Sequence, residues 1–152
     1  MKAKLTAAAA ALFLATLPFA AHADLPGHHP AYLHALTDLR DARWNLEHRP
    51  GDLAVTIHET AAIAEIDRAI EEAKRAAAED AKNLADRPHE DAHLNRPGRL
   101  HHAAELLRKA RGDADQEEDN PQSRELKHRV LHHIDEALHE TEKAIRDVER
   151  NR

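Results

Sequence analysis

The sequence predicts an all-α protein: an antiparallel four-helix bundle made of two tandem helical hairpins and preceded by a cleaved signal peptide. The composition is rich in Ala and charged residues and includes only four Gly, which favours helix. Apolar residues recur at helical spacing in four segments. The pattern of residues 32–80 returns 68 positions further on without a gap, so one supersecondary element is expected to be used twice.

The internal repeat is clearest in two short runs. Leu39-Arg40-Asp41-Ala42-Arg43 returns as Leu107-Arg108-Lys109-Ala110-Arg111, and Ile66-Asp67-Arg68-Ala69 returns as Ile134-Asp135-Glu136-Ala137. Either hairpin alone would leave its apolar stripe in water, so the two are expected to pack on each other. A monomeric bundle and a hairpin-swapped dimer both satisfy this requirement.

Residues 1–23 have the pattern of a secretory signal peptide. Lys2 and Lys4 give a positive start, residues 5–17 are apolar, and Ala21-His22-Ala23 matches an A-x-A cleavage site. The alternative, an uncleaved membrane anchor, is disfavoured because the apolar run is shorter than the roughly 20 residues that a span needs. We therefore expect a periplasmic or secreted protein that has no membrane segment after cleavage.

The first hairpin is expected at residues 30–85, after an extended arm at residues 24–29. Pro30 suits a first helical turn, and the first helix should end near Glu47, before the turn residues 49–52. Thr56 and Glu59 match a capping box that opens a second helix, which should reach about Leu84.

A connection at residues 86–98 should lead to the second hairpin at residues 99–150, because prolines and a glycine punctuate this stretch. The third helix is expected from Leu100 to about Glu117, weakened by Gly112 in its interior. Asn120-Pro121 should supply a cap and a first-turn proline for the last helix. That helix shows the clearest amphipathic pattern in the chain.

Composition excludes several classes of function. The chain has no Cys, which removes disulfides, thiolate metal sites and Cys nucleophiles, and Ser123 is its only serine. The leader holds two of the 22 basic residues and none of the 28 acidic ones, so the mature part carries a formal charge of −8. A basic face for nucleic acid is therefore not expected. Because candidate nucleophiles are so few, we do not expect an enzyme either, and no cofactor should be required.

Histidine is the compositional outlier, with 13 of the 14 lying beyond His22. On the last helix, His128, His132, Asp135 and His139 fall on one side, away from the apolar stripe. Two histidines one turn apart can share a metal ion, and Asp135 can add an oxygen. Imidazole and carboxylate ligands suit Zn(II), Ni(II) or Cu(II). The alternative is an ordinary solvated polar face.

A second candidate for metal binding is His89-Glu90-Asp91-Ala92-His93, which spells the H-E-x-x-H string of zinc peptidases. Pro88 and Pro97 leave too little room for the long buried helix that such a catalytic site needs. Peptidase activity is therefore not expected. Capture of a labile ion by His89 and His93 in the connection fits this context better.

Arg43 and Arg111 occupy equivalent positions beside the apolar stripes, as do Asp67 and Asp135. An arginine near a core needs a partner, and its planar fork suits a carboxylate. We therefore expect each arginine to pair with a carboxylate on a facing helix. A role in fixing helix register is favoured over a catalytic role.

These patterns lead to one main functional hypothesis and two alternatives. The main hypothesis is an exported, non-enzymatic bundle that binds or buffers divalent transition metal weakly at several places. The first alternative is an acid-responsive chaperone, because full protonation of 13 histidines would change the mature charge from −8 to +5. The second alternative is an adaptor that binds an unidentified protein partner through exposed helix faces.

Overall fold

The structure, a computed structural model, describes residues 30–77, 93–116 and 124–151, and these residues contain four α-helices and no strand. The helices are α1 (Pro30–Leu46), α2 (Ile57–Ala77), α3 (Arg96–Asp115) and α4 (Arg124–Arg150). This arrangement confirms the all-helical class that the sequence predicts. The expected leader and arm, residues 1–29, lie outside the described residues.

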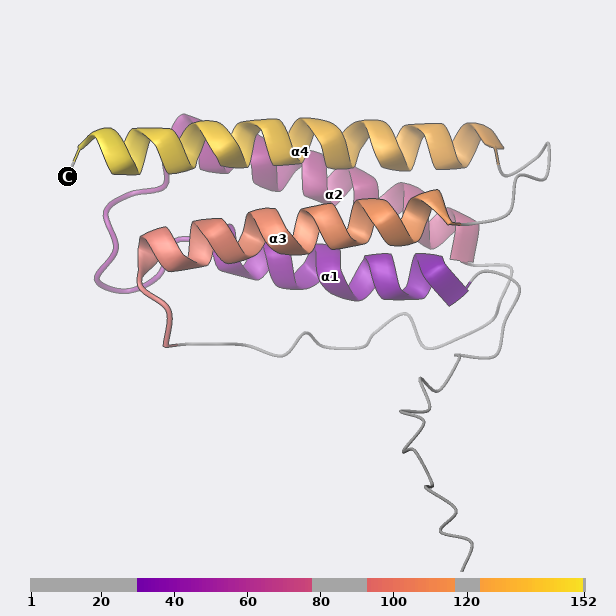
Figure 1. Cartoon of the computed structure of the whole chain (residues 1–152), viewed down its shortest axis with the longest axis horizontal. Coiled ribbons are helices and arrows are strands. Elements are labelled where there is room, and N and C mark those ends of the chain that lie inside the picture. Colours follow the sequence, from indigo (N-terminus) through magenta and orange to yellow (C-terminus); the bar gives the residue numbers. More distant parts are fainter. Residues whose placement is uncertain (1–29, 78–92, 117–123, 152) are drawn as a thin grey trace, which may run out of the picture.

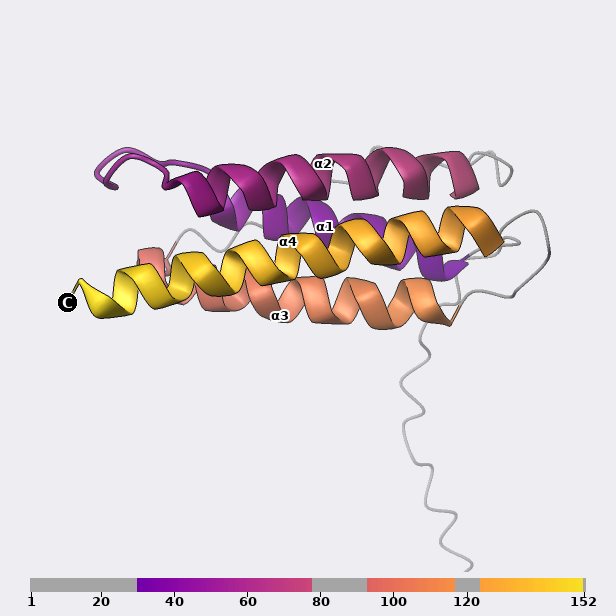
Figure 2. The same ribbon diagram turned by 90° about the horizontal axis from the view of Figure 1, so that it is seen from above.

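The four helices lie side by side as a bundle (Figure 1). α1 packs on α2 and on α3, while α4 packs on α3 and on α2. Figures 1 and 2 show α1 and α4 running in one direction and α2 and α3 in the other, so every packed pair is antiparallel. α2 ends at the opposite end of the bundle from the point where α3 begins.

The core is built from Ala, Leu, Ile and Val together with one Tyr. Many buried positions in the second half of the bundle lie 68 residues after a buried position in the first half. These pairs are Tyr32 and Leu100, Ala35 and Ala103, Leu36 and Ala104, Leu39 and Leu107, Ala42 and Ala110, Leu46 and Ala114, Ala62 and Val130, Ile66 and Ile134, Ala69 and Ala137, and Ala73 and Thr141. The same apolar frame thus appears in both hairpins.

The start of α2 has the predicted capping box. The Thr56 amide donates to Glu59 Oε2 at 2.6 Å, and the Glu59 amide donates to Thr56 Oγ1 at 3.2 Å. Two backbone donors at the helix end are therefore satisfied reciprocally. Before it, Gly51 turns the chain with a φ of +89°, a conformation that favours glycine.

The start of α3 differs from the prediction, because the helix begins at Arg96 rather than at Leu100. Asn95 caps it, and its Oδ1 accepts a hydrogen bond from the Gly98 amide at 3.0 Å. Pro97 lies in the first turn, where no intrahelical bond needs its missing N–H. The proline and glycine taken as signs of a loop are therefore part of the helix.

The predicted ends of the other helices are described only in part. α2 is helical to Ala77, and its expected extension to Leu84 falls in residues 78–92, outside the described part. The expected cap at Asn120-Pro121 lies in residues 117–123 and is likewise not described. Within the ranges that are described, no helix combines the length and apolar character needed to cross a bilayer.

Candidate functional site: the seam between the long helices

The predicted metal ligands on the last helix do not form a closed site. His128, His132 and His139 are exposed on α4, and the His132 ring lies 5.4 Å from the ring of His133. Asp135 accepts a hydrogen bond from Arg111. Among the described residues, no group of three or more His, Cys, Asp or Glu is arranged to hold a metal ion. This face therefore offers imidazoles in pairs at most.

The second predicted metal pair is only half described. His93 lies just before α3 and is exposed, whereas His89 is outside the described residues. The distance between the two imidazoles is therefore not defined, and ion capture by this pair stays a prediction.

The structure brings together each predicted arginine and aspartate. Arg43 Nε donates to Asp67 Oδ1 at 2.7 Å, joining α1 to α2, and Arg111 Nε donates to Asp135 Oδ1 at 2.6 Å, joining α3 to α4. These hydrogen bonds raise the pKa of both arginines. The pairs are solvent-exposed, so each contributes little stability, roughly 0.2 to 1 kcal/mol. They suit a role in fixing register.

Two histidines that sequence reasoning missed join the long helices. His58 Nδ1 lies 2.6 Å from Glu140 Oε2, and His133 Nδ1 lies 2.8 Å from Glu65 Oε2. Both pairs connect α2 to α4 and are partly buried. The sequence offers a signal for the second pair alone, because Glu65 and His133 are 68 positions apart, which is the offset at which the sequence pattern recurs.

Their surroundings favour the ionised form of these two carboxyl groups. Burial raises the pKa of Glu65, but hydrogen bonds from His133 and Arg68 outweigh this effect and hold the pKa below 4.5. Hydrogen bonds from Lys143 and His58 lower the pKa of Glu140 in the same way. Both carboxyl groups are therefore held in the anionic form, which can pair with an imidazolium or with another cation.

The interface between α1 and α3, the two shorter helices, has a different polar feature. Asp38 on α1 is only 6% exposed, and both of its oxygens accept hydrogen bonds from Lys109 Nζ on α3 at 2.9 Å. Burial raises the pKa of Asp38 despite the lowering effect of Lys109, and the nearby Asp113 raises it further. The α1–α3 interface therefore has one buried acid, flanked by a cation and a second acid.

One end of the bundle is closed by two buried ion pairs. Arg96 at the start of α3 binds both oxygens of Glu59, which is only 3% exposed, and Arg99 pairs with Asp52. Sequence reasoning missed both arginines because it placed them at or beside the edge of a connection. A bidentate pair between Arg and a carboxylate is among the stronger charged contacts.

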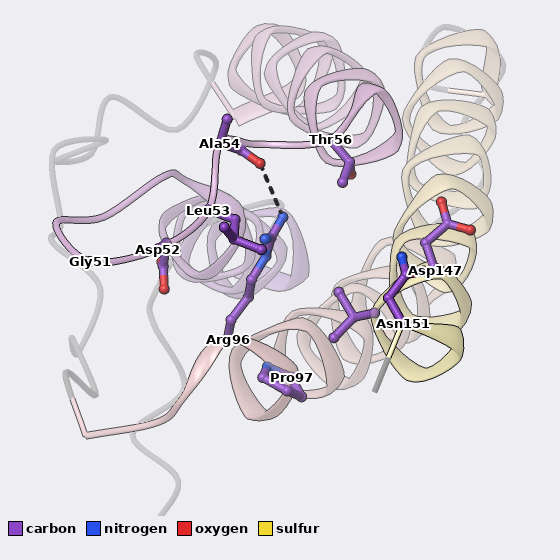
Figure 3. A pocket seen from close by; sticks show the side chains of 10 residues that line it. Gly51, Asp52, Leu53, Ala54, Thr56, Arg96, Pro97, Asp147 and Asn151 are labelled. Carbon is purple, nitrogen blue, oxygen red and sulfur yellow. Dashed lines mark hydrogen bonds between the residues drawn. The ribbon is translucent and has the colours of Figure 1, made fainter.

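Beside these pairs lies a pocket of about 430 Å³ (Figure 3). It is bounded by the loop before α2, the start of α3 and the end of α4. Arg96 Nη2 crosses one side to reach the Ala54 carbonyl, and Asp147 and Asn151 come from α4. Leu53 at its rim is 80% exposed. Apolar and polar side chains thus alternate around the pocket, with Leu53 and Asp52 on the loop side and Val148 and Asp147 on the α4 side.

Comparison with known proteins assigns no family. No protein-family model, no curated protein and no solved structure matches this chain. The fold and the side chains described above therefore carry the functional argument. They define a helical bundle in which two histidines pair with carboxylates on the seam between its two longest helices.

Proposed function

We propose that this protein is an exported, non-enzymatic helical bundle that binds divalent transition metal weakly and at several places. The single observation that carries the proposal is the exposure of His128, His132 and His139 on one long, regular helix. Imidazoles one turn apart bind Zn(II), Ni(II) or Cu(II) when a partner oxygen or water completes the shell. A buffer or accessory of metal handling needs this kind of loose capture.

Weak rather than tight binding follows from the arrangement of the ligands. Structural zinc sites close four ligands around the ion, whereas the described part of this chain has no group of three. Asp135, the expected oxygen donor, is engaged by Arg111. Each pair of imidazoles would therefore bind an ion together with water ligands, and neighbouring side chains would add little affinity.

Isothermal titration with ZnCl₂, NiCl₂ and CuCl₂ tests the proposal. We expect binding with dissociation constants at or below about 100 μM, equivalent to roughly 5.5 kcal/mol, and a smaller total heat when His128, His132 and His139 are all replaced by Ala. The matched control is His34→Ala, which removes a single exposed histidine on α1. Absence of heat in this range, or an unchanged triple variant, would reject this function.

The second candidate is an acid-responsive chaperone, and one observation favours it. His58 and His133 each contact a carboxylate across the α2–α4 seam, so their charge state bears on helix packing. An imidazolium attracts a carboxylate more strongly than a neutral ring does, so mild acid should change the stability of this seam while it reverses the surface charge. Circular dichroism from pH 7.5 to 4.5, with an assay for client aggregation, tests this function; a flat response in both would exclude it.

We further propose that the two hairpins arose by tandem duplication and that residues 1–23 direct export. The first idea is supported by the burial of residues 68 positions apart. Mass spectrometry of protein secreted from a bacterial host tests the second, because cleavage after Ala23 should leave Asp24 as the first residue. Size-exclusion chromatography with light scattering separates a monomer from a hairpin-swapped dimer.

A further inference from the structure

His58 lies between two acidic side chains at one end of the α2–α4 seam. It belongs to the first turn of α2, whereas Glu140 and Asp147 are two turns apart on α4. His58 Nδ1 lies 2.6 Å from Glu140 Oε2, and His58 Nε2 lies 3.8 Å from Asp147 Oδ2. Each ring nitrogen therefore faces a different carboxylate.

Both carboxylates are held by a base one turn further along α4. Lys143 Nζ donates to Glu140 Oε1 at 2.6 Å, and Arg150 Nη2 lies 3.5 Å from Asp147 Oδ1. The oxygen that remains on each carboxylate is the one that faces His58. Glu140 is therefore oriented by a hydrogen bond, whereas the contact of Asp147 with the exposed Arg150 is longer and looser.

The short contact determines where the proton of neutral His58 lies. Glu140 Oε2 has no hydrogen to donate when ionised, so Nδ1 must be the donor across the 2.6 Å separation. Neutral imidazole has one N–H, so Nε2 is then left with a lone pair in the neighbourhood of Asp147 Oδ2. Two electron-rich atoms 3.8 Å apart make a place for a cation.

From this geometry we propose a specific site for a divalent transition ion, with His58 Nε2 and Asp147 Oδ2 as its protein ligands. In a tetrahedral zinc site, ligand bonds of about 2.0–2.2 Å put neighbouring ligand atoms roughly 3.4 Å apart, a few tenths of an ångström closer than here. Glu140 is the outer carboxylate that fixes the tautomer and the ring, an arrangement common at metal-binding histidines.

Water completes the coordination shell. The side chains of His58 and Asp147 are 30% and 35% exposed, so an ion and its water ligands can reach them from solvent. One imidazole and one carboxylate favour Zn(II), Ni(II) or Cu(II) over Mg(II), which prefers oxygen ligands alone. This inference rests on the proposed metal-binding function and names its tightest site.

The site joins residues that are far apart in the sequence. His58 comes from the first hairpin and Asp147 from the second, so a bound ion connects the two halves of the bundle. A ligand that binds the folded form alone raises its stability by mass action. Metal binding at this site should therefore raise the melting temperature, and by more than weak binding to a pair of histidines on the exposed face of α4.

The experiment is thermal unfolding of the mature chain, residues 24–152, followed by circular dichroism with ZnCl₂ or NiCl₂, and with MgCl₂ as the inert probe. We expect zinc and nickel to raise the melting temperature of the wild type. His58→Ala and Asp147→Asn should remove most of the rise, and Asp147→Asn, with nearly the same shape, guards against misfolding. Glu140→Gln should weaken binding about tenfold or more while leaving both ligands in place.

The matched control replaces His128, His132 and His139 together by Ala and should keep the rise. If His58→Ala and Asp147→Asn keep the wild-type rise, this site is wrong, and calorimetry of the same variants shows whether the exposed histidines still bind metal. If the wild type binds no metal in calorimetry, the proposed function itself fails. The two failures are therefore distinguishable.

Discussion

The α1–α3 and α2–α4 interfaces, which hold the two hairpins together, share an apolar frame but differ in polar chemistry. Leu39 and Leu107 fill the first, Ile66 and Ile134 fill the second, and all four are fully buried. The short helices bury one acid against a lysine, whereas the long helices join histidines to carboxylates. The buried apolar residues are therefore common to both interfaces, and the polar contacts are what distinguish one interface from the other.

The largest effect should come from the shared frame. Leu107→Ala on the short-helix side and Ile134→Ala on the long-helix side should each lower the free energy of unfolding by about 2–5 kcal/mol, because each leaves a cavity in a packed core. Urea denaturation measures both. Leu53→Ala, at an 80% exposed position, is the control and should stay within about 0.5 kcal/mol. A large difference between the two core variants would contradict a shared frame.

The second effect should be confined to the short-helix side. Lys109→Ala removes the cation beside the buried Asp38 and should cost about 1–3 kcal/mol at pH 7. The pKa of Asp38 already lies above its ordinary 3.8, and loss of Lys109 raises it further. A carboxyl with a raised pKa favours the folded state most when protonated, so the cost should shrink as the pH falls towards 4.

Asp38→Asn is the matched control for that experiment. The amide has no charge to bury, can accept from Lys109 and can donate to Asp113, so its stability at pH 7 should equal or exceed that of the wild type. Chemical denaturation at pH 7 and pH 4 gives all the values. A costly Asp38→Asn would mean that the ionised carboxylate is itself required.

A smaller effect concerns Gly112, which lies 68 positions after Trp44, so the two hairpins differ at this position. Gly112 lies inside α3, and a Cβ built there meets no atom within 4 Å. Gly112→Ala should therefore raise the free energy of unfolding by up to about 1 kcal/mol. The melting temperature measures it, and Gly51→Ala, at a φ of +89°, should change stability in the opposite direction.

The smallest effect concerns the long-helix side. Because the pKa of Glu65 lies below 4.5, its ionised form stabilises the bundle above that pH, and the contribution is lost as the pH falls through the lowered value. Glu65→Gln should cost a few tenths to about 1 kcal/mol at pH 6, since water screens the pair, and less as the pH falls through the lowered pKa of Glu65. Arg68→Gln, which keeps His133 in contact, should cost less; an equal loss would assign the effect to Arg68.

Periodicity alone predicted the helices, because each apolar stripe must face the core. The capping box at Thr56 was predictable too, because it depends on residues three positions apart. The start of α3 was not: Pro97 and Gly98 break helices in the interior but are accepted in a first turn. Which side chains meet across helices depends on how each helix is rotated about its axis. That rotation is why the contact of His58 with Glu140 was missed, whereas Arg96 was missed because it was placed in the connection.

The antiparallel packing of every neighbouring pair also affects the electric field of the bundle. Each end of the bundle has two helix amino termini and two carboxyl termini, so the peptide dipoles of the four helices largely cancel. Neither end should therefore attract ions through its backbone. Any preference for a cation near Asp147 must come from side chains, which single substitutions can remove.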